Sequence, residues 1–160
     1  MKFSDFICKD ALNADLQSTA KEETIQEMVQ SLVDAGHVTP EDKDDILKAV
    51  IKREELGSTG IGHGVAVPHT RHPSVTDRLL GAVAVSSSGV DFAAIDGEPV
   101  HLLFLLISPQ DRPSDHLHAL EYISRHLRDE MFCNFLKQAK SVTDITQLLD
   151  EADEHQFGNG

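Results

Sequence analysis

Positively charged residues are scarce in this sequence. Its 160 residues include 14 lysines and arginines against 27 aspartates and glutamates, which gives a formal net charge of −13. Proteins that bind nucleic acid contact its phosphates with basic side chains, and anionic membrane surfaces attract basic segments in the same way. The charge balance therefore argues against nucleic acid or an anionic membrane surface as a partner.

Cysteines and long apolar segments are also few. Cys8 and Cys133 lie far apart, in no spacing typical of a metal or redox site, so we expect two reduced thiols. The N-terminal residues lack the uninterrupted apolar segment of a signal peptide. The longest apolar run, residues 102–107, is far too short to cross a bilayer. We therefore expect a cytoplasmic protein that does not insert into membranes.

Three of the ten glycines alternate within residues 60–64, just before a short apolar segment, residues 65–67, that ends in Pro68 and His69. Glycine allows backbone conformations that other residues avoid, and successive N–H groups in such conformations can surround an anion. A nucleophilic side chain beside an anion-binding loop is what acyl or phosphoryl transfer requires. The pattern favours His69 as a nucleophile over a histidine that merely hydrogen-bonds at a strand end.

The same glycines do not form a nucleotide-binding motif. Gly57 and Gly62 have the spacing of a P-loop, but His63-Gly64 follows where Lys and Ser or Thr are required. A dinucleotide fingerprint needs a strand before the glycines and a helix after them, and here the order is reversed. We therefore expect no cofactor, and the phosphoryl group should arrive on another molecule.

Apolar periodicity predicts a mixed α/β fold with a mixed central sheet flanked by helices. A pair of antiparallel helices precedes the glycine loop, and strands and further helices follow it. One domain is expected over residues 1–150, followed by an acidic flexible tail over 151–160. The expected helices are 19–36, 39–56, 114–128, 130–139 and 143–149, the central strands 79–85 and 100–107, and a short edge strand 90–93.

The segment from Thr59 to His69, with Arg53 upstream and Asp115-His116-Leu117 downstream, resembles the type-2 enzyme IIA domain of the bacterial phosphoenolpyruvate-dependent sugar phosphotransferase system. That family includes the fructose, mannitol and nitrogen-regulatory IIA proteins. The likeness covers residues 6–149, and its glycine-rich core ending in Pro-His is quite specific. It implies that His69 accepts a phosphoryl group on Nε2 from the phosphohistidine of a small phosphocarrier protein. Arg53 and His116 would belong to the same site.

We expect the phosphoryl group to be bound by the loop residues Thr59, Gly62, His63 and Gly64, chiefly through backbone N–H groups. Relatives often carry asparagine where His63 stands, and its backbone N–H is unchanged. In sugar-transport relatives the next acceptor is a cysteine of a IIB protein. No IIB or membrane part is recognisable within the 160 residues, which favours a free-standing relay or regulator.

Helical geometry separates two neighbouring histidines of the predicted helix 114–128. Residues two positions apart point about 200° away from each other around a helix axis, so only one of His116 and His118 can join the site. The pattern selects His116, although a histidine at the core boundary bonded to a backbone carbonyl explains it equally well. We expect His116 to face inward with Leu117, Leu120, Ile123 and Leu127, and His118 to face solvent with Tyr122 and Arg125.

Three functions from different classes fit these patterns. The first is a phosphotransferase that relays a phosphoryl group through His69, with Arg53 and His116 as catalytic partners. The second is a regulatory binding module switched by the same phosphorylation, without onward transfer. The third is a metallohydrolase with His63, His69 and His72 as ligands. No Cys, Asp or Glu lies near these histidines before Asp77, so we expect no metal.

Overall fold

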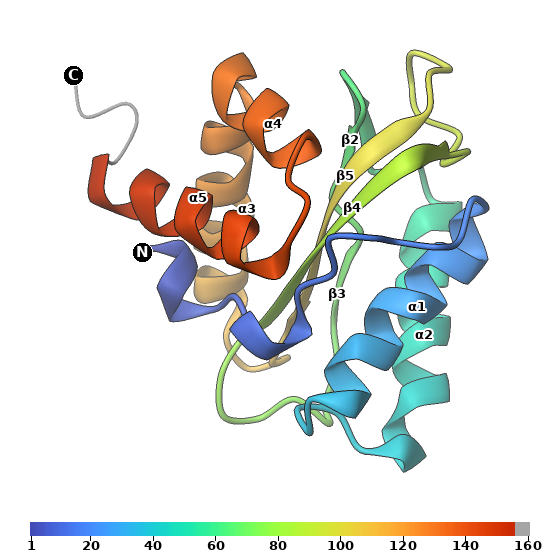
Figure 1. Ribbon diagram of the computed structural model, residues 1–160. Helices are drawn as coiled ribbons and strands as arrows, with labels where there is room; N and C mark the ends of the chain where they lie inside the picture. Colours follow the sequence, from blue (N-terminus) through green and yellow to red (C-terminus); the bar gives the residue numbers. More distant parts are fainter. Residues whose placement is uncertain (156–160) are drawn as a thin grey trace.

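A central sheet lies between two groups of helices in the computed structural model, which describes residues 1–155 (Figure 1). Helices α1 (Lys21–Asp34) and α2 (Pro40–Glu55) cover one face of the sheet. Helices α3 (Pro113–Leu127), α4 (Glu130–Lys137) and α5 (Val142–His155) cover the other. The predicted mixed α/β class is confirmed.

Strand β5 (Val100–Ser108) is the centre of the sheet. The long strand β4 (Leu80–Val90) pairs with one edge of β5 in antiparallel orientation. Two short strands, β2 (Val65–Ala66) and β3 (His69–Arg71), pair in parallel with its other edge. Strand β1 (Gly60–Gly62) is antiparallel to β2 and forms the outer edge. The glycine region therefore begins at the rim of the sheet and leads inward to its centre.

Proline interrupts the ladder between β2 and β3. Ala66 lies opposite Leu103 and His69 opposite Leu106, so the two strands follow one another along the same edge of β5. Pro68 has no N–H to donate, although its carbonyl accepts the N–H of Leu106 at 3.0 Å. Pro68 thus separates β2 from β3 along the edge of β5.

Both faces of the central strand are buried, which explains its almost unbroken apolar sequence. Alternate side chains of a strand point to opposite faces, so β5 contributes to two separate cores. Each fully buried large aliphatic or aromatic side chain contributes about 1.5–3 kcal/mol. Leu103, Leu105 and Ile107 pack with α1 and α2, whereas Leu102, Phe104 and Leu106 pack with α3, α4 and α5.

Several predicted strand boundaries are wrong. The expected edge strand 90–93 is not separate, because β4 continues to Val90 through a shift of register between Val85 and Val90. Residues 60–62, expected as loop, form β1. His69, expected where a strand stops, is the first residue of β3. Pairing with a neighbouring strand sets these boundaries: β5 is the partner of β3 and β4, and β2 is the partner of β1. A local sequence pattern does not show which strands will pair.

Two predicted helix boundaries also change. Helix α3 begins at Pro113 with Arg112 as N-cap, not at Ser114, because proline suits the first helical position. Helix α5 continues to His155, so the predicted tail is wrong for residues 151–155; residues 156–160 lie outside the described residues. Asp153 is buried and accepts the backbone N–H of Phe3 at 2.7 Å, which fastens α5 to the N-terminus. None of the helices within residues 1–155 has the length and apolarity to cross a bilayer.

Candidate functional site

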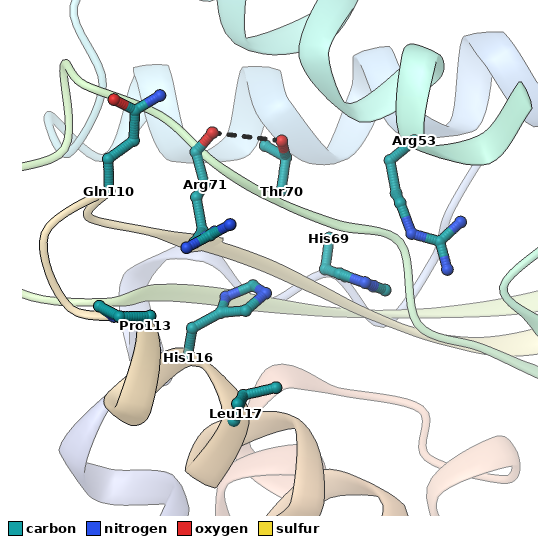
Figure 2. Close-up of a pocket in the computed structure, with 8 residues that line it drawn as sticks. All are labelled: Arg53, His69, Thr70, Arg71, Gln110, Pro113, His116 and Leu117. Atoms are coloured by element: carbon teal, nitrogen blue, oxygen red, sulfur yellow. Dashed lines mark hydrogen bonds between the residues drawn. The ribbon is translucent and has the colours of Figure 1, made fainter. Parts of the chain in front are cut away.

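A cleft of about 790 Å³ lies where α2, β3 and α3 meet (Figure 2). Arg53 reaches it from the last turn of α2, His69 from the start of β3 and His116 from the first turns of α3. The structure thus brings together the three residues that the sequence assigned to one site. The other lining residues are Thr70, Arg71, Gln110, Pro113 and Leu117, and none of the lining residues is acidic.

A backbone carbonyl determines which nitrogen of His69 is available. Nδ1 of His69 lies 2.8 Å from the carbonyl oxygen of Val67. A carbonyl can only accept, so Nδ1 carries the proton and the lone pair remains on Nε2. Val67 and His69 flank Pro68, at the interruption between β2 and β3. A neutral imidazole held in this tautomer presents Nε2 as a nucleophile.

A buried serine orients His116 in a similar way. Nδ1 of His116 lies 2.7 Å from Oγ of Ser108, which is fully buried at the end of β5. A buried hydroxyl hydrogen needs an acceptor, and within residues 1–155 Nδ1 of His116 is the one beside Ser108; the tautomer that satisfies it has the proton of His116 on Nε2. The ring centroids of His69 and His116 are 5.7 Å apart. One ring therefore offers a lone pair and the other an N–H donor.

Both histidines are held in the neutral form near pH 7. Burial lowers the pKa of His69 and the charge of Arg53 adds to the lowering, while the bond to Val67 and the charge of Glu54 oppose it. Burial, with the charges of His69 and Arg71, lowers the pKa of His116 to about 4. A neutral His69 can attack an electrophile, and a neutral His116 can still donate a hydrogen bond.

A buried carboxylate anchors the end of α2 that carries Arg53. Glu54 is 6% exposed and accepts hydrogen bonds from the hydroxyl and the N–H of Thr59, the latter at 3.2 Å. Lys21 of α1 pairs with it at 3.0 Å. Arg53 itself donates to the carbonyl of Gly57 at 3.0 Å. These contacts fix the helix end, and the Arg53 guanidinium reaches the cleft beside His69 (Figure 2).

The predicted phosphate-binding loop does not line this cleft. The Thr59 hydroxyl is bonded to Glu54, and the N–H of His63 donates to the carboxylate of Asp96 at 3.1 Å. Gly62, His63 and Gly64 all have positive φ, at 97°, 58° and 75°. The expected anion-binding turn thus exists, but a carboxylate of the chain itself occupies it. The structure therefore places Thr59, Gly62, His63 and Gly64 outside the lining of the His69 cleft, contrary to the expected arrangement.

Strand geometry explains the separation. Five residues of extended chain lead from Gly64 to His69, and at about 3.3 Å per residue they span roughly 16 Å. Gly62 and His63 instead line a second cleft of about 680 Å³, between the glycine loop and helices α3 and α4. Closeness in sequence along a strand therefore does not place the loop around the histidine.

The histidines of the predicted metal site do not converge. His72 is bonded through Nε2 to Asp45 at 2.6 Å and through Nδ1 to Ser74 at 2.7 Å, so both ring nitrogens are engaged. Among residues 1–155 no group of three or more His, Cys, Asp and Glu side chains is placed to hold a metal ion. The metallohydrolase alternative has no ligand set in this part of the chain.

Helix α3 confirms the predicted opposition of its two histidines and the inward placement of His116 and Ile123, but two other residues of the helix lie on the opposite side from the one predicted. His116 is 8% exposed and His118 is exposed. Leu117, expected inside, is 64% exposed, and Tyr122, expected in solvent, is 6% exposed. The ring of Phe3 packs 4.8 Å from that of Tyr122. The N-terminal segment thus covers a side of α3 that the periodicity assigned to water.

Arg71 is a lining residue that the sequence reasoning missed. It follows His69 by two positions on β3, and residues i and i+2 of a strand point to the same side. The signal was therefore present in the spacing. The spacing indicates this position only when His69 begins a strand, whereas the sequence pattern predicts it at the end of one.

The fold and the cleft define a class of protein: a three-layer α/β domain that exposes a neutral, oriented histidine between cationic side chains. The family model described as "Phosphoenolpyruvate-dependent sugar phosphotransferase system, EIIA 2" matches residues 5–152. The chain belongs to that family, which confirms the resemblance noted from its motifs.

Relatives of two kinds are similar to the chain. A nitrogen regulatory protein of Bradyrhizobium diazoefficiens is 32% identical over 93% of this chain and 95% of its own length. A fructose-specific EIIABC component of Bacillus subtilis is 33% identical over 96% of this chain but only 24% of its own length.

Solved structures share the fold. Nitrogen regulatory protein IIA-Ntr from Neisseria meningitidis has a TM-score of 0.81 and 27% identity over 92% of this chain and 98% of that one. A mannitol enzyme IIA from Escherichia coli, solved in complex with phosphorylated enzyme IIB, has a TM-score of 0.71 and 23% identity over 89% and 95% of the two chains. The regulatory and the sugar-specific relatives thus share one architecture.

Proposed function

We propose that the protein is a phosphotransferase that carries a phosphoryl group on Nε2 of His69. A small phosphocarrier protein with a phosphohistidine supplies the group, and a cysteine of a IIB-type protein receives it. The observation that carries this proposal is the hydrogen bond from Nδ1 of His69 to the carbonyl of Val67, which leaves Nε2 as a free nucleophile at an open cleft. Family membership supports the same chemistry.

The transfer exchanges one N–P bond for another. The Nε2 lone pair attacks the phosphorus of a donor phosphohistidine whose ring is protonated on its other nitrogen. The donor N–P bond breaks, its electron pair returns to the donor nitrogen, and the donor leaves as neutral imidazole. His69 becomes a phosphoimidazolium whose Nδ1–H remains bonded to Val67. Because the two bonds are alike, the step requires neither a nucleotide nor a metal.

Arg53 and His116 are the proposed catalytic partners. Charge accumulates on the three equatorial oxygens of the phosphoryl group in the loose transition state. The Arg53 guanidinium beside His69 and the Nε2–H of His116 can donate to these oxygens. Donors that are already oriented stabilise such charge without reorganising at the moment of reaction.

Onward transfer returns the site to its starting state. A cysteine thiolate of the acceptor attacks the phosphorus, the N–P bond breaks, and its electron pair returns to Nε2 of neutral His69. The EIIABC name of the Bacillus relative and the mannitol neighbour's complex with phosphorylated enzyme IIB make a IIB-type protein the acceptor to test first. The cytoplasm is the proposed compartment, which suits the two free buried cysteines, Cys8 and Cys133.

A regulatory switch at the same histidine is the second candidate. The Bradyrhizobium and Neisseria relatives are both named nitrogen regulatory proteins. Phosphorylation adds about −1.5 to −2 charges. At His69 that charge would appear beside Leu117, which is 64% exposed, and could change the binding of a protein partner. Transfer from phosphorylated protein to a IIB-type protein distinguishes the two, because a regulator without an acceptor retains its phosphoryl group.

The test is His69→Ala. Incubation with a phosphorylated carrier should give the unmodified protein an acid-labile, base-stable gain in mass, and the variant none. His118→Ala, an exposed histidine on α3, is the matched control and should be phosphorylated normally. An unchanged melting temperature of His69→Ala shows that the fold persists. Full phosphorylation of that variant would contradict the proposal.

A further inference from the structure

We infer that Arg71 binds the phosphoryl group carried by His69, from the His116 side of the cleft, and forms a two-arginine clamp with Arg53. This inference rests on the proposed function of His69. It assigns a further phosphate-binding residue to the reaction, one that the motifs of the sequence do not single out.

The sheet places Arg71 at the corner of the cleft. His69 lies opposite Leu106 and Arg71 opposite Ser108 in the parallel pairing of β3 with β5. Side chains opposite one another in neighbouring strands point to the same face, so His69 and Arg71 both face α3. Ser108 is the residue that orients His116. Arg71 therefore stands next to the residue that fixes the second histidine.

The close-up view agrees with this placement. In Figure 2 the guanidinium of Arg71 lies beside the ring of His116, and Arg53 lies on the other side of His69. The charge of Arg71 lowers the pKa of His116, whereas that of Arg53 lowers the pKa of His69. The two arginines thus flank the pair of histidines from opposite ends.

The Arg71 guanidinium has no internal anion. Within residues 1–155 this guanidinium forms no ion pair and donates no hydrogen bond; the backbone carbonyl of Arg71 accepts from the Thr70 hydroxyl. By contrast, Arg125 of α3 pairs with Glu121 at 3.1 Å. An exposed, unpaired guanidinium in a chain of net charge −13, on a cleft without acidic lining, is positioned for an external anion.

The chemistry suits an arginine. A guanidinium presents parallel N–H donors that match two oxygens of a phosphoryl group, and its charge is independent of pH in the physiological range. His116 can donate only one hydrogen bond. Arg71 would hold the equatorial oxygens from the His116 side of the cleft, opposite Arg53, so it should stabilise both the transition state and phosphorylated His69.

The experiment compares Arg71→Gln and Arg71→Lys with Arg125→Gln, an exposed arginine on α3 outside the lining of the cleft. Three quantities are measured for each: the single-turnover rate of transfer from a phosphorylated carrier, the hydrolysis rate of isolated phosphoprotein, and the pH titration of its phosphorus-31 resonance. Hydrolysis and titration involve no partner, so they separate contact with the phosphoryl group from docking of the carrier.

Arg71→Gln should slow transfer at least about tenfold, the usual effect of losing a charge-assisted hydrogen bond. It should also raise the phosphoryl pKa, because a nearby cation favours the dianion. Arg71→Lys should recover part of both effects, and Arg125→Gln should match the unmodified protein. Slower transfer with unchanged hydrolysis and titration would make Arg71 a docking residue and overturn the inference, as would no change at all.

Failure of the proposed function looks different in the same experiment. In that case the unmodified protein is not phosphorylated, or His69→Ala is phosphorylated as well. If His69→Ala abolishes phosphorylation while all Arg71 variants behave like the unmodified protein, the inference about Arg71 is contradicted and the proposed function is not. Melting temperatures of all variants, expected to be equal, exclude a folding defect.

Discussion

The two clefts of this protein differ in whether their anion-binding groups already have partners. At the glycine loop, the N–H of His63 donates to Asp96, and the ammonium of Lys137 donates to the carbonyl of His63. At the His69 cleft, Arg53 and Arg71 have no carboxylate partner within residues 1–155. The glycine loop has the more unusual backbone conformation, whereas the His69 cleft has the cationic donors without a carboxylate partner among the described residues.

This difference shows that backbone conformation alone is a poor guide to a binding site. A turn with positive φ angles can exist because a strand must reverse, and it can satisfy its N–H groups with an internal carboxylate. A ligand is bound by groups that remain unsatisfied in the free protein.

The largest effect in this series should come from His116→Ala. Loss of one oriented donor to a charged transition state costs about 10²–10³ in rate in oxyanion sites. Transfer to His69 should slow by that factor, whereas His118→Ala should be nearly unaffected. Single-turnover rates of the two variants, measured under identical conditions, provide the check. A larger defect for His118→Ala would reverse the assignment of His116 to the site.

The second effect concerns pH. The pKa of His69 is lowered, so its ring stays neutral to a lower pH than an ordinary histidine, whose pKa is 6.5. Transfer should be insensitive to His69 ionisation from pH 8 to 7. It should then fall about tenfold per pH unit below the lowered pKa, as the nucleophile becomes protonated. Rates measured across this range, together with ring titrations by NMR, test the prediction. A decline already centred above pH 6.5 would contradict it.

Folding stability should also decrease as the pH falls. The pKa of folded His116 is about 4, against 6.5 for an ordinary histidine, so the unfolded chain binds more protons between these values. The contribution of His116 to stability is therefore complete above pH 6.5 and is lost as the pH falls toward 4. Urea unfolding at several pH values should show a smaller decline for His116→Gln than for the unmodified protein.

A smaller effect is expected at the second cleft. Gly62 has φ of 97°, and an added Cβ would lie 3.3 Å from the Asp96 carboxylate. Gly62→Ala should cost about 1–2 kcal/mol of stability and lower the melting temperature by about 2–8 °C. The transfer rate of the folded variant should remain near normal. A normal melting temperature with a strongly reduced transfer rate would instead indicate that the loop binds the phosphoryl group.

The smallest effect on transfer is expected from treatment with a metal chelator. The proposed transfer uses only the ring nitrogens and the donors around them, so exhaustive chelation should leave the transfer rate unchanged. Metal analysis of the purified protein provides an independent measurement. Stoichiometric zinc whose removal abolishes transfer would contradict the metal-free transfer and favour the metallohydrolase alternative.

The sequence by itself determined the helical pair, the central strands and the α/β class, because those elements carry their own apolar periodicity. It also brought Arg53, His69 and His116 into one hypothesis, through a resemblance resting on a glycine-rich motif. It did not determine the boundaries of β1 and β3, whose short segments become strands only by pairing with neighbours.

Only the tertiary structure decided which groups meet. It shows Asp96 occupying the glycine turn, the N-terminal Phe3 covering Tyr122, and Arg71 at the corner of the cleft beside Ser108. Each of these relations joins segments that are distant in sequence. Local patterns record which way a side chain points along its own helix or strand, whereas partners depend on how those elements pack together.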